Sequence, residues 1–253
     1  MNRMTIVFIT LMTFWIPMNA VADLLIAEGQ QYQRASQEIA DNTLVKELGK
    51  QSTSPIMVIE FFSYGCVGCF KLDPLIEAWR TKLPANVTFQ RIPVEFHAEW
   101  RNLTKAYYTA INLNAFDKIH TPLFDAIHNN KLTSASDDAI REFFTNNGIE
   151  AKDFEKEFDS FNTNRKQKWA KSVTRAYRIT AIPAFIVQGP QGIFVTTARA
   201  AGSQENIITV LDHLIKLEQD ESPAVAQTPV PETSGPSTPE STTQPTTQPK
   251  KED

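Results

Sequence analysis

The sequence predicts an α/β fold that a helical segment interrupts, and three observations indicate this. An apolar run at residues 56–62 is followed by a helical pattern and then by a second apolar run at 87–94. Residues 96–179 then follow a helical pattern. Two more strand patterns, at 182–188 and 193–200, precede a final amphipathic helix. This order predicts a sheet with helices on its faces, split in sequence by the helical insertion.

The first strand and helix are the clearest elements. The run "IMVIEFF" at 56–62 is broken only by Glu60 and is short enough for a strand buried on both faces. Residues 69–83 have apolar side chains at helical spacing, and Pro74 would bend that helix. The run "VTFQRIPV" at 87–94 completes a strand–helix–strand unit.

The insertion and the end of the folded part follow from the same periodicity. Residues 167–177 and a segment starting near Ser136 are predicted helices. The runs "IPAFIVQ" and "IFVTTARA", joined by "GPQG", predict a hairpin, and residues 203–218 predict the closing helix. The apolar helical faces of the insertion are Trp100, Leu103, Tyr107 and Ile111, then Leu123, Phe124 and Ile127, then Ile140, Phe143 and Phe144.

The composition is that of a globular protein. Of the 253 residues, 42% are hydrophobic and 21% are charged, and the net charge is −4. So small an acidic excess gives no electrostatic reason to expect nucleic acid as a partner.

The first 22 residues have the pattern of a secretory signal peptide. Arg3 gives a basic start, residues 4–16 are mostly apolar, and Pro17 ends the run. The small residues "AVA" at 20–22 fit cleavage after Ala22. The alternative is a buried N-terminal helix. We expect an exported protein whose mature chain begins at Asp23.

The last residues, 221–253, differ in composition from the rest. They hold seven of the fifteen prolines and no aromatic residue, leucine or isoleucine. Such a segment buries too little apolar area to fold, so we expect a disordered tail rich in Pro, Thr, Ser and Gln. It is either a solvated tail without a ligand or a spacer or tether to the envelope.

The only two cysteines, Cys66 and Cys69, lie in the stretch "EFFSYGCVGCFKLDP" at 60–74. A closed zinc site needs about four Cys or His ligands. A structural disulfide between residues three apart would constrain the unfolded chain only weakly. We therefore expect thiol redox chemistry, with no metal and no cofactor. The histidines lack ligand spacing and are expected to be solvated or hydrogen-bonded: His97, His120, His128 and His213.

The position of the cysteines at the start of a helix makes them unequal. A thiolate at the first position meets unpaired N–H groups and the positive end of the helix dipole, which lower the pKa of Cys66. Cys69, one turn inside, should be shielded. We expect Cys66 to exchange with a partner and Cys69 to resolve the mixed disulfide. Because this stabilises the reduced form, it makes the disulfide more oxidising.

The residues around the cysteines resemble the DsbA family of periplasmic thiol–disulfide oxidoreductases. The resemblance rests on "VIEFFSYGCVGCFKLDP" at 58–74, the helical insertion and "IPAFIV" at 182–187, and it covers residues 28–218. The stretch "EGQQYQRA" at 28–35 looks like the family's opening strand. The resemblance implies a thioredoxin fold at 23–95 and 180–220, with an inserted all-helical domain at 96–179.

The resemblance also implies roles for site residues. Cys66 matches the nucleophilic cysteine and Cys69 the resolving one. Pro183 matches the cis-proline that faces the sulfurs, the alternative being an ordinary strand-edge proline. The backbone of Ile182 would then pair with an extended substrate peptide.

A buried acid accompanies the cysteines in this family, and Glu60 matches it. A buried carboxylate titrates high and can accept the proton of Cys69. Arg91, on the next strand, takes the place of a basic partner. The alternative for Glu60 is a surface-facing strand residue.

The two residues between the cysteines depart from the family pattern. Strongly oxidising members commonly carry Pro-His there, whereas this chain has Val67 and Gly68. Ile182 before the proline resembles thioredoxin, a reductant. Val67, Gly68 and Ile182 are the expected substrate-binding residues, and they leave the direction of electron flow open.

Three functions are therefore considered. The first is an oxidase of the bacterial envelope that introduces disulfides into reduced or unfolded exported proteins and is reoxidised by a membrane redox partner. The second is a disulfide isomerase or reductase, although isomerases of this superfamily usually carry a dimerisation domain before the catalytic one. The third is a non-catalytic envelope binding protein, which the intact Cys66, Cys69 and Pro183 disfavour.

Overall fold

The computed structural model describes residues 26–129, 131–132 and 135–220. The predicted signal peptide, at 1–22, and the predicted disordered tail, at 221–253, lie outside the described residues and stay predictions.

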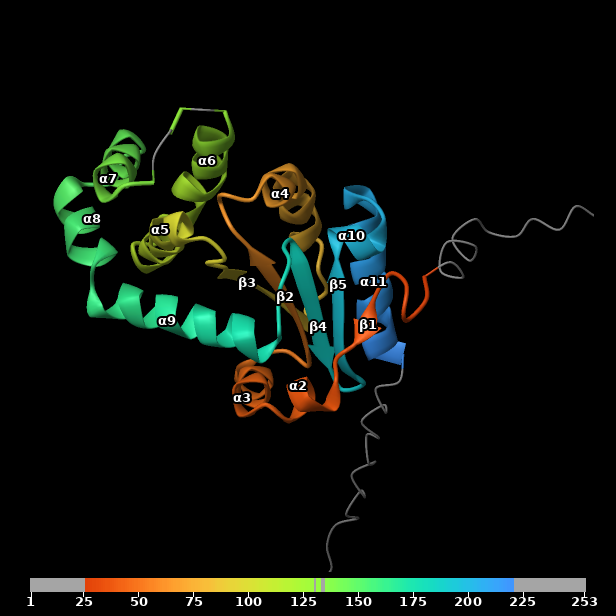
Figure 1. The fold of residues 1–253 in the computed structure, drawn as a ribbon. Coiled ribbons are helices and arrows are strands. Elements are labelled where there is room, and N and C mark those ends of the chain that lie inside the picture. Colours follow the sequence, from red (N-terminus) through yellow and green to blue (C-terminus); the bar gives the residue numbers. More distant parts are fainter. Residues whose placement is uncertain (1–25, 130, 133–134, 221–253) are drawn as a thin grey trace, which may run out of the picture. The chain divides into compact units, whose positions relative to one another are not determined.

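A mixed five-stranded sheet lies at the centre of the described chain, in the order β1-β5-β4-β2-β3 (Figure 1). β2 runs parallel to β3 and antiparallel to β4, and β4 and β5 form the predicted hairpin. β2 and β4 are therefore neighbours although the whole insertion separates them in sequence. The strands are Gln33–Arg34 (β1), Ile56–Phe62 (β2), Val87–Pro93 (β3), Ala184–Gly189 (β4) and Gly192–Thr197 (β5).

The central strand β2 is buried on both faces, as its continuous apolar run predicts. The side chains at 57, 59 and 61 pack with the helices of the insertion. Those at 56 and 58 pack on the other face with α4 (Val67–Arg80) and α11 (Gln204–Asp220). Because strand side chains alternate, Glu60 belongs to this second face, beneath α4.

The helical insertion is built around α5 (Arg101–Asn112). Residues 103–110 of this helix are all buried, as expected for a helix surrounded by others. It contacts all four of the longer helices that follow it. These four helices are α6 (Phe116–His128), α7 (Asp137–Asn146), α8 (Ala151–Phe158) and α9 (Phe161–Ala176). The short 3-10 helix η1 (Ala98–Trp100) precedes α5.

The remaining helices of the described chain are short. α2 (Gln37–Asp41) and α3 (Thr43–Gln51) connect β1 to β2, and Asn42 caps α3 by accepting hydrogen bonds from two backbone N–H groups. α10 (Ala198–Ala201) follows β5 directly.

Three predicted elements have different bounds in the structure. The opening strand expected at 28–35 is reduced to Gln33–Arg34, because only these residues pair with β5. The strand expected at 193–200 ends at Thr197, whose hydroxyl accepts a hydrogen bond from Ala200 N–H at 3.1 Å and starts α10. The helix expected at 167–177 begins earlier, at Phe161, because Ser160 caps it.

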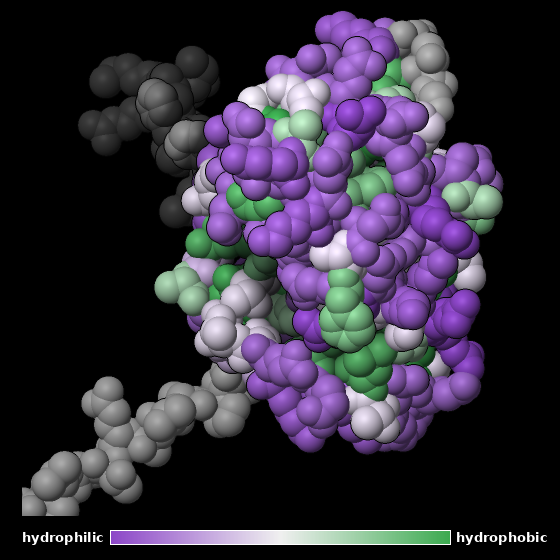
Figure 2. Space-filling model, turned by 90° about the vertical axis from the view of Figure 1, so that its left-hand side faces the viewer, coloured by the Kyte–Doolittle hydropathy of each residue, from purple (hydrophilic) through white to green (hydrophobic). Residues whose placement is uncertain are grey.

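The outward face of the helical insertion is mostly hydrophilic, with hydrophobic side chains in separate small areas (Figure 2). Of the large apolar side chains in the described part of the chain, Phe161 is the most exposed, with 84% of its accessible area. Among the described residues, no helix has the length and apolar character needed to cross a membrane.

Candidate active site

The two cysteines lie where β2 gives way to α4. The helix starts at Val67, so Cys66 is its N-cap, with an extended backbone conformation. Cys69 N–H donates a hydrogen bond to Cys66 Sγ at 3.2 Å. A side-chain acceptor at the N-cap satisfies an N–H group that lacks a partner within the helix. Here that acceptor is sulfur, which gains most from the contact when it is a thiolate.

The two thiols have different electrostatic environments. Hydrogen bonding with Cys69 is the largest influence on Cys66 and, with backbone N–H groups of Cys69 and Gly68, it lowers the pKa of Cys66 to about 7, against the opposing effect of burial. Cys69 is only 1% exposed, and burial raises its pKa well above the ordinary value. The predicted asymmetry is therefore present in the geometry and in the electrostatics.

The loop before β4 approaches Cys66 from the other side. The Ile182–Pro183 peptide bond is cis. The carbonyl oxygen of Ile182 lies 3.9 Å from Cys66 Sγ. A Cβ placed on Gly68 would stand 3.3 Å from Pro183 Cδ. The fold thus gathers four of the predicted site residues, and the small Gly68 leaves room between the redox pair and the proline.

Val67 is the outermost of the predicted site residues. Its side chain is 55% exposed, whereas Cys66 beside it is half-buried. An exposed apolar side chain next to the accessible sulfur is suited to contact with an incoming chain.

Glu60 is buried beneath the active-site helix, and the surface-facing alternative is wrong. It is 2% exposed, and its carboxylate accepts a hydrogen bond from Arg91 Nε at 2.7 Å. Burial raises the pKa of Glu60 in spite of the neighbouring guanidinium. Arg91 is therefore the basic partner that the sequence predicted, and the role of Glu60 in proton transfer stays a prediction.

The comparisons with known proteins agree with this geometry. Residues 57–207 match the family described as DSBA-like thioredoxin domain. The thiol:disulfide interchange protein DsbA of Azotobacter vinelandii is 34% identical over 198 residues, which cover 78% of this chain and 86% of that protein. The protein of the same name from Pseudomonas syringae pv. tomato is 33% identical, covering 80% and 89%.

The chain belongs to the DsbA family. The solved crystal structure of Pseudomonas aeruginosa DsbA is similar to it with a TM-score of 0.67 and 26% identity, covering 77% of this chain and 95% of that one. The DsbA-like thioredoxin fold with its helical insertion, predicted above, is thereby confirmed.

In this DsbA family member, Arg91 is the centre of a buried ion-pair cluster. Besides Glu60 it binds Asp73 Oδ1 through Nη2 at 3.1 Å and Glu77 Oε1 through Nη1 at 2.5 Å. Although burial opposes its ionisation, hydrogen bonds from Arg80 and Arg91 lower the pKa of Glu77 to about 2. One cation thus ties β2, α4 and β3 together beneath the cysteines.

Two carboxylates of this cluster and the neighbouring His120 also have the arrangement of metal ligands. Ligand atoms of Asp73, Glu77 and His120 lie within 4.8 Å of one another. The guanidinium of Arg91 is hydrogen-bonded to both carboxylates, and His120 Nε2 bonds Asp73 Oδ1 at 2.9 Å. The positive charge that these carboxylates need is therefore supplied by the chain itself.

Sequence reasoning missed the contribution of the insertion to the site. Trp100 covers Gly65, where an added Cβ would stand 2.3 Å from Trp100 Nε1. His120 and His128 both bond Tyr64. Aromatic residues recur at every fourth position of α6, namely 116, 120, 124 and 128, and this period was the signal that could have found the two histidines.

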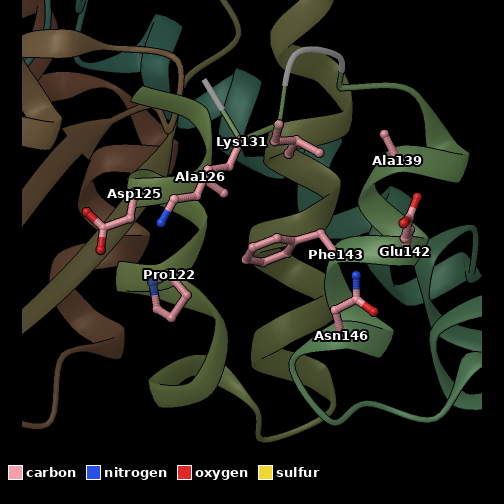
Figure 3. A pocket seen from close by; sticks show the side chains of 9 residues that line it. Pro122, Asp125, Ala126, Lys131, Ala139, Glu142, Phe143 and Asn146 are labelled. Carbon is pink, nitrogen blue, oxygen red and sulfur yellow. The ribbon is translucent and has the colours of Figure 1, made fainter. Parts of the chain in front are cut away.

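A separate pocket of about 550 Å³ lies between α6 and α7, away from these residues (Figure 3). Figure 3 shows Phe143 on one wall and Pro122 and Ala126 on the other. None of the predicted site residues lines it. Its lining consists of Pro122, Asp125, Ala126, Lys131, Leu132, Ala139, Glu142, Phe143 and Asn146.

Proposed function

We propose that the protein is a dithiol oxidase of the bacterial envelope, which transfers its Cys66–Cys69 disulfide to reduced exported proteins. The hydrogen bond from Cys69 N–H to Cys66 Sγ carries this proposal. It favours the Cys66 thiolate, so it favours the reduced enzyme, and the disulfide form gains oxidising power.

The accessibility of the sulfurs supports one order of steps. A client thiolate attacks Cys66, the half-buried sulfur of the enzyme disulfide, and Cys69 is released. A second client thiolate then attacks the client sulfur of the mixed disulfide and releases the Cys66 thiolate. The client loses two electrons and two protons. The enzyme disulfide takes up the two electrons, Cys69 takes up one proton because its pKa is raised, and the other proton passes to solvent while Cys66 is a thiolate.

The resolving step needs a proton acceptor. In reoxidation Cys69 must lose its proton to attack a mixed disulfide at Cys66, and its raised pKa makes that loss unfavourable. Glu60, whose pKa burial also raises, is the proposed acceptor.

The surroundings of Cys66 support extended polypeptide clients. The Ile182 carbonyl lies 3.9 Å from the sulfur, and Val67 offers an exposed apolar contact. An extended client segment would pair with the backbone at Ile182 and lie across Val67, Gly68 and Pro183. Since backbone pairing requires no particular side chain, it suits many unfolded clients.

The location and the electron acceptor complete the proposal. The secretory pattern at residues 1–22 supports export to the periplasm, with cleavage after Ala22. A membrane redox partner would reoxidise the pair there, and the tail at 221–253 is a candidate tether to the envelope. Mass spectrometry of protein from the envelope should give a mature N-terminus at Asp23.

One observation favours a second function, a reductase or isomerase. The pKa of Cys66 is lowered to about 7, which is nearer to that of thioredoxin, about 7, than to that of strongly oxidising DsbA proteins, about 3.5. The missing histidine between Val67 and Cys69 agrees with this milder value.

Two experiments separate these functions. A Cys69→Ala variant should accumulate mixed disulfides with envelope proteins at Cys66, and recovery of none would reject both enzymatic functions. Equilibration with glutathione gives the potential of the pair. An oxidase should lie above about −200 mV, whereas a value near about −270 mV would assign a reductase.

A further inference from the structure

The turn before Cys66 contains Gly65, whose lack of a side chain leaves the backbone of the turn weakly restricted. Cys66 N–H bonds Ser63 O at 3.0 Å, and Gly65 N–H bonds Ser63 Oγ at 3.2 Å. Residue 65 of this turn is a glycine, and glycine tolerates most backbone conformations. The conformation of this turn therefore depends on contacts from outside it as well as on these two hydrogen bonds.

Helix α6 supplies two of those contacts, both to Tyr64. The Tyr64 hydroxyl lies 2.9 Å from His120 Nδ1, and His128 Nε2 donates to the Tyr64 carbonyl oxygen at 2.8 Å. Tyr64 is 1% exposed, and its ring meets Phe124 edge-on at 4.8 Å. Side chain and backbone of one residue are thus fixed by the same helix.

The same face of α6 also holds the helix that carries Cys69. The ring of Phe70 stacks on His128 at 4.6 Å and 14°. His120 Nε2 bonds Asp73 on α4 at 2.9 Å. The two histidines therefore bridge the residues before the cysteine pair and the residues after it.

The partners of His120 assign its protonation. Asp73 accepts, so Nε2 carries the proton, and Nδ1 accepts from the Tyr64 hydroxyl. Burial lowers the pKa of His120 and raises that of Tyr64, so both stay uncharged near neutral pH. The Tyr64 hydroxyl and the His120 ring are therefore two uncharged donors in series, and the series ends at the Asp73 carboxylate.

We propose that His120 and His128 are positioning residues for the redox reaction: by holding Tyr64, they keep Cys66 at the N-cap of α4, where its sulfur meets Cys69 N–H. This inference rests on the proposed role of Cys66 as the exchanging thiol. Without these contacts the turn keeps its two hydrogen bonds to Ser63 and the cover of Trp100 but loses the anchor of Tyr64, so the Cys66 sulfur can shift from the N–H groups that stabilise its thiolate. The helical insertion thereby sets the reactivity of a thiol that it does not carry.

Four variants of the full mature chain test the proposal. Tyr64→Phe removes only the hydroxyl that meets His120, and His128→Leu removes the donor to the Tyr64 carbonyl. His128→Gln keeps an N–H donor and serves as the rescue. His213→Gln, in α11, is the matched histidine control.

The measurement is the pH dependence of iodoacetamide alkylation of the reduced protein, with the modified cysteine identified by peptide mass. His128→Leu should raise the apparent pKa of Cys66 by about half a unit to one unit, which slows alkylation at pH 6 about three- to ten-fold. Tyr64→Phe should shift it in the same direction by less. His128→Gln should restore most of the reactivity, and His213→Gln should change nothing.

Unchanged reactivity of Cys66 in both Tyr64→Phe and His128→Leu would overturn the proposal, as would an equal shift in His213→Gln. If His128→Leu does not fold, Tyr64→Phe and His128→Gln still decide, the first by a slower rate and the second by a preserved one. Preferential alkylation of Cys69 in the unmodified protein would instead reject the proposed function, so the two failures are distinguishable.

Discussion

The sheet with its covering helices and the helical insertion contribute to the redox site in different ways. Every group expected to react or to meet a client, from Cys66 to Pro183, lies on β2, at the N-cap or first turn of α4, or on the loop before β4. The insertion supplies Trp100, His120 and His128, which contact the turn beside Cys66. The difference teaches that an inserted domain can contribute to the environment of a reactive thiol by contacting the residues next to it, without supplying a reacting group itself.

The largest expected effect concerns the buried charges of the sheet part. Arg91→Leu leaves the carboxylates of Glu60 and Asp73 buried without their cation. Breaking a buried pair in this way should destabilise the protein by about 3–5 kcal/mol, measured by urea unfolding. Arg80→Leu is the control, because its pair with Glu77 is partly exposed and should cost less than about 1 kcal/mol. Equal losses of stability in the two variants would mean that the buried ion pairs of Arg91 contribute no more than the partly exposed pair of Arg80.

The second prediction concerns the two thiols. In the reduced protein Cys66 should alkylate with a midpoint near pH 7. Cys69 should react at least about 100-fold more slowly at pH 7, because burial keeps its thiol protonated. Comparable rates would show that the asymmetry on which the site depends is absent.

The same shift predicts a pH dependence of stability. The pKa of Cys66 is lowered from 9.0 to about 7, so its stabilising contribution is full above pH 9 and is lost as the pH falls through 7. The reduced protein should therefore gain stability over reduced Cys66→Ala between pH 7 and 9, measured by thermal unfolding. A constant difference across this range would contradict the lowered pKa.

A third, smaller effect is expected where the two parts touch. Gly65→Ala places a Cβ against the Trp100 indole and should cost about 1–3 kcal/mol. Trp100→Ala should remove most of that penalty in the double variant, which a double-mutant cycle detects. Additive losses would mean that the indole does not restrict Gly65.

The smallest effect should arise inside the insertion, away from the site. Ser160 caps α9 by accepting a hydrogen bond from Thr163 N–H at 3.0 Å. Ser160→Ala should cost about 1 kcal/mol and leave the alkylation profile of Cys66 unchanged. A shifted profile would show that stability of the insertion as such, rather than the contacts to Tyr64, controls the thiol.

The predicted parts of the fold are those whose signal is local. Strands β2, β3 and β4 and helix α11 follow from hydrophobic period and came out close to their predicted bounds. The strand predicted at 193–200 was too long. Its last residues fit a strand pattern, but the Thr197 hydroxyl caps helix α10 there. The opening strand was also too long, since pairing at a sheet edge depends on the partner strand rather than on the sequence of the stretch itself.

The same division applies to the site. Cys66 and Cys69 are adjacent on one helical turn, and Glu60, Arg91 and Pro183 came from the family resemblance. His120 and His128 meet Tyr64 across 56 and 64 residues of sequence. The four-residue period of α6 places both histidines on one face of the helix, but that they meet Tyr64 depends on how α6 packs on α4, which the period does not specify.

The contacts of His120 with Tyr64 and Asp73 also limit how the protein can be truncated. Deleting the residues between β3 and β4 to obtain a minimal redox scaffold would take away the partner of the Tyr64 hydroxyl and one donor to Asp73. A truncated scaffold would need Tyr64→Phe, whereas Asp73 would keep its ion pair with Arg91 on β3. A graft of foreign helices would have to bring an imidazole to this position. In engineering terms, the insertion is a component of its host rather than a detachable module.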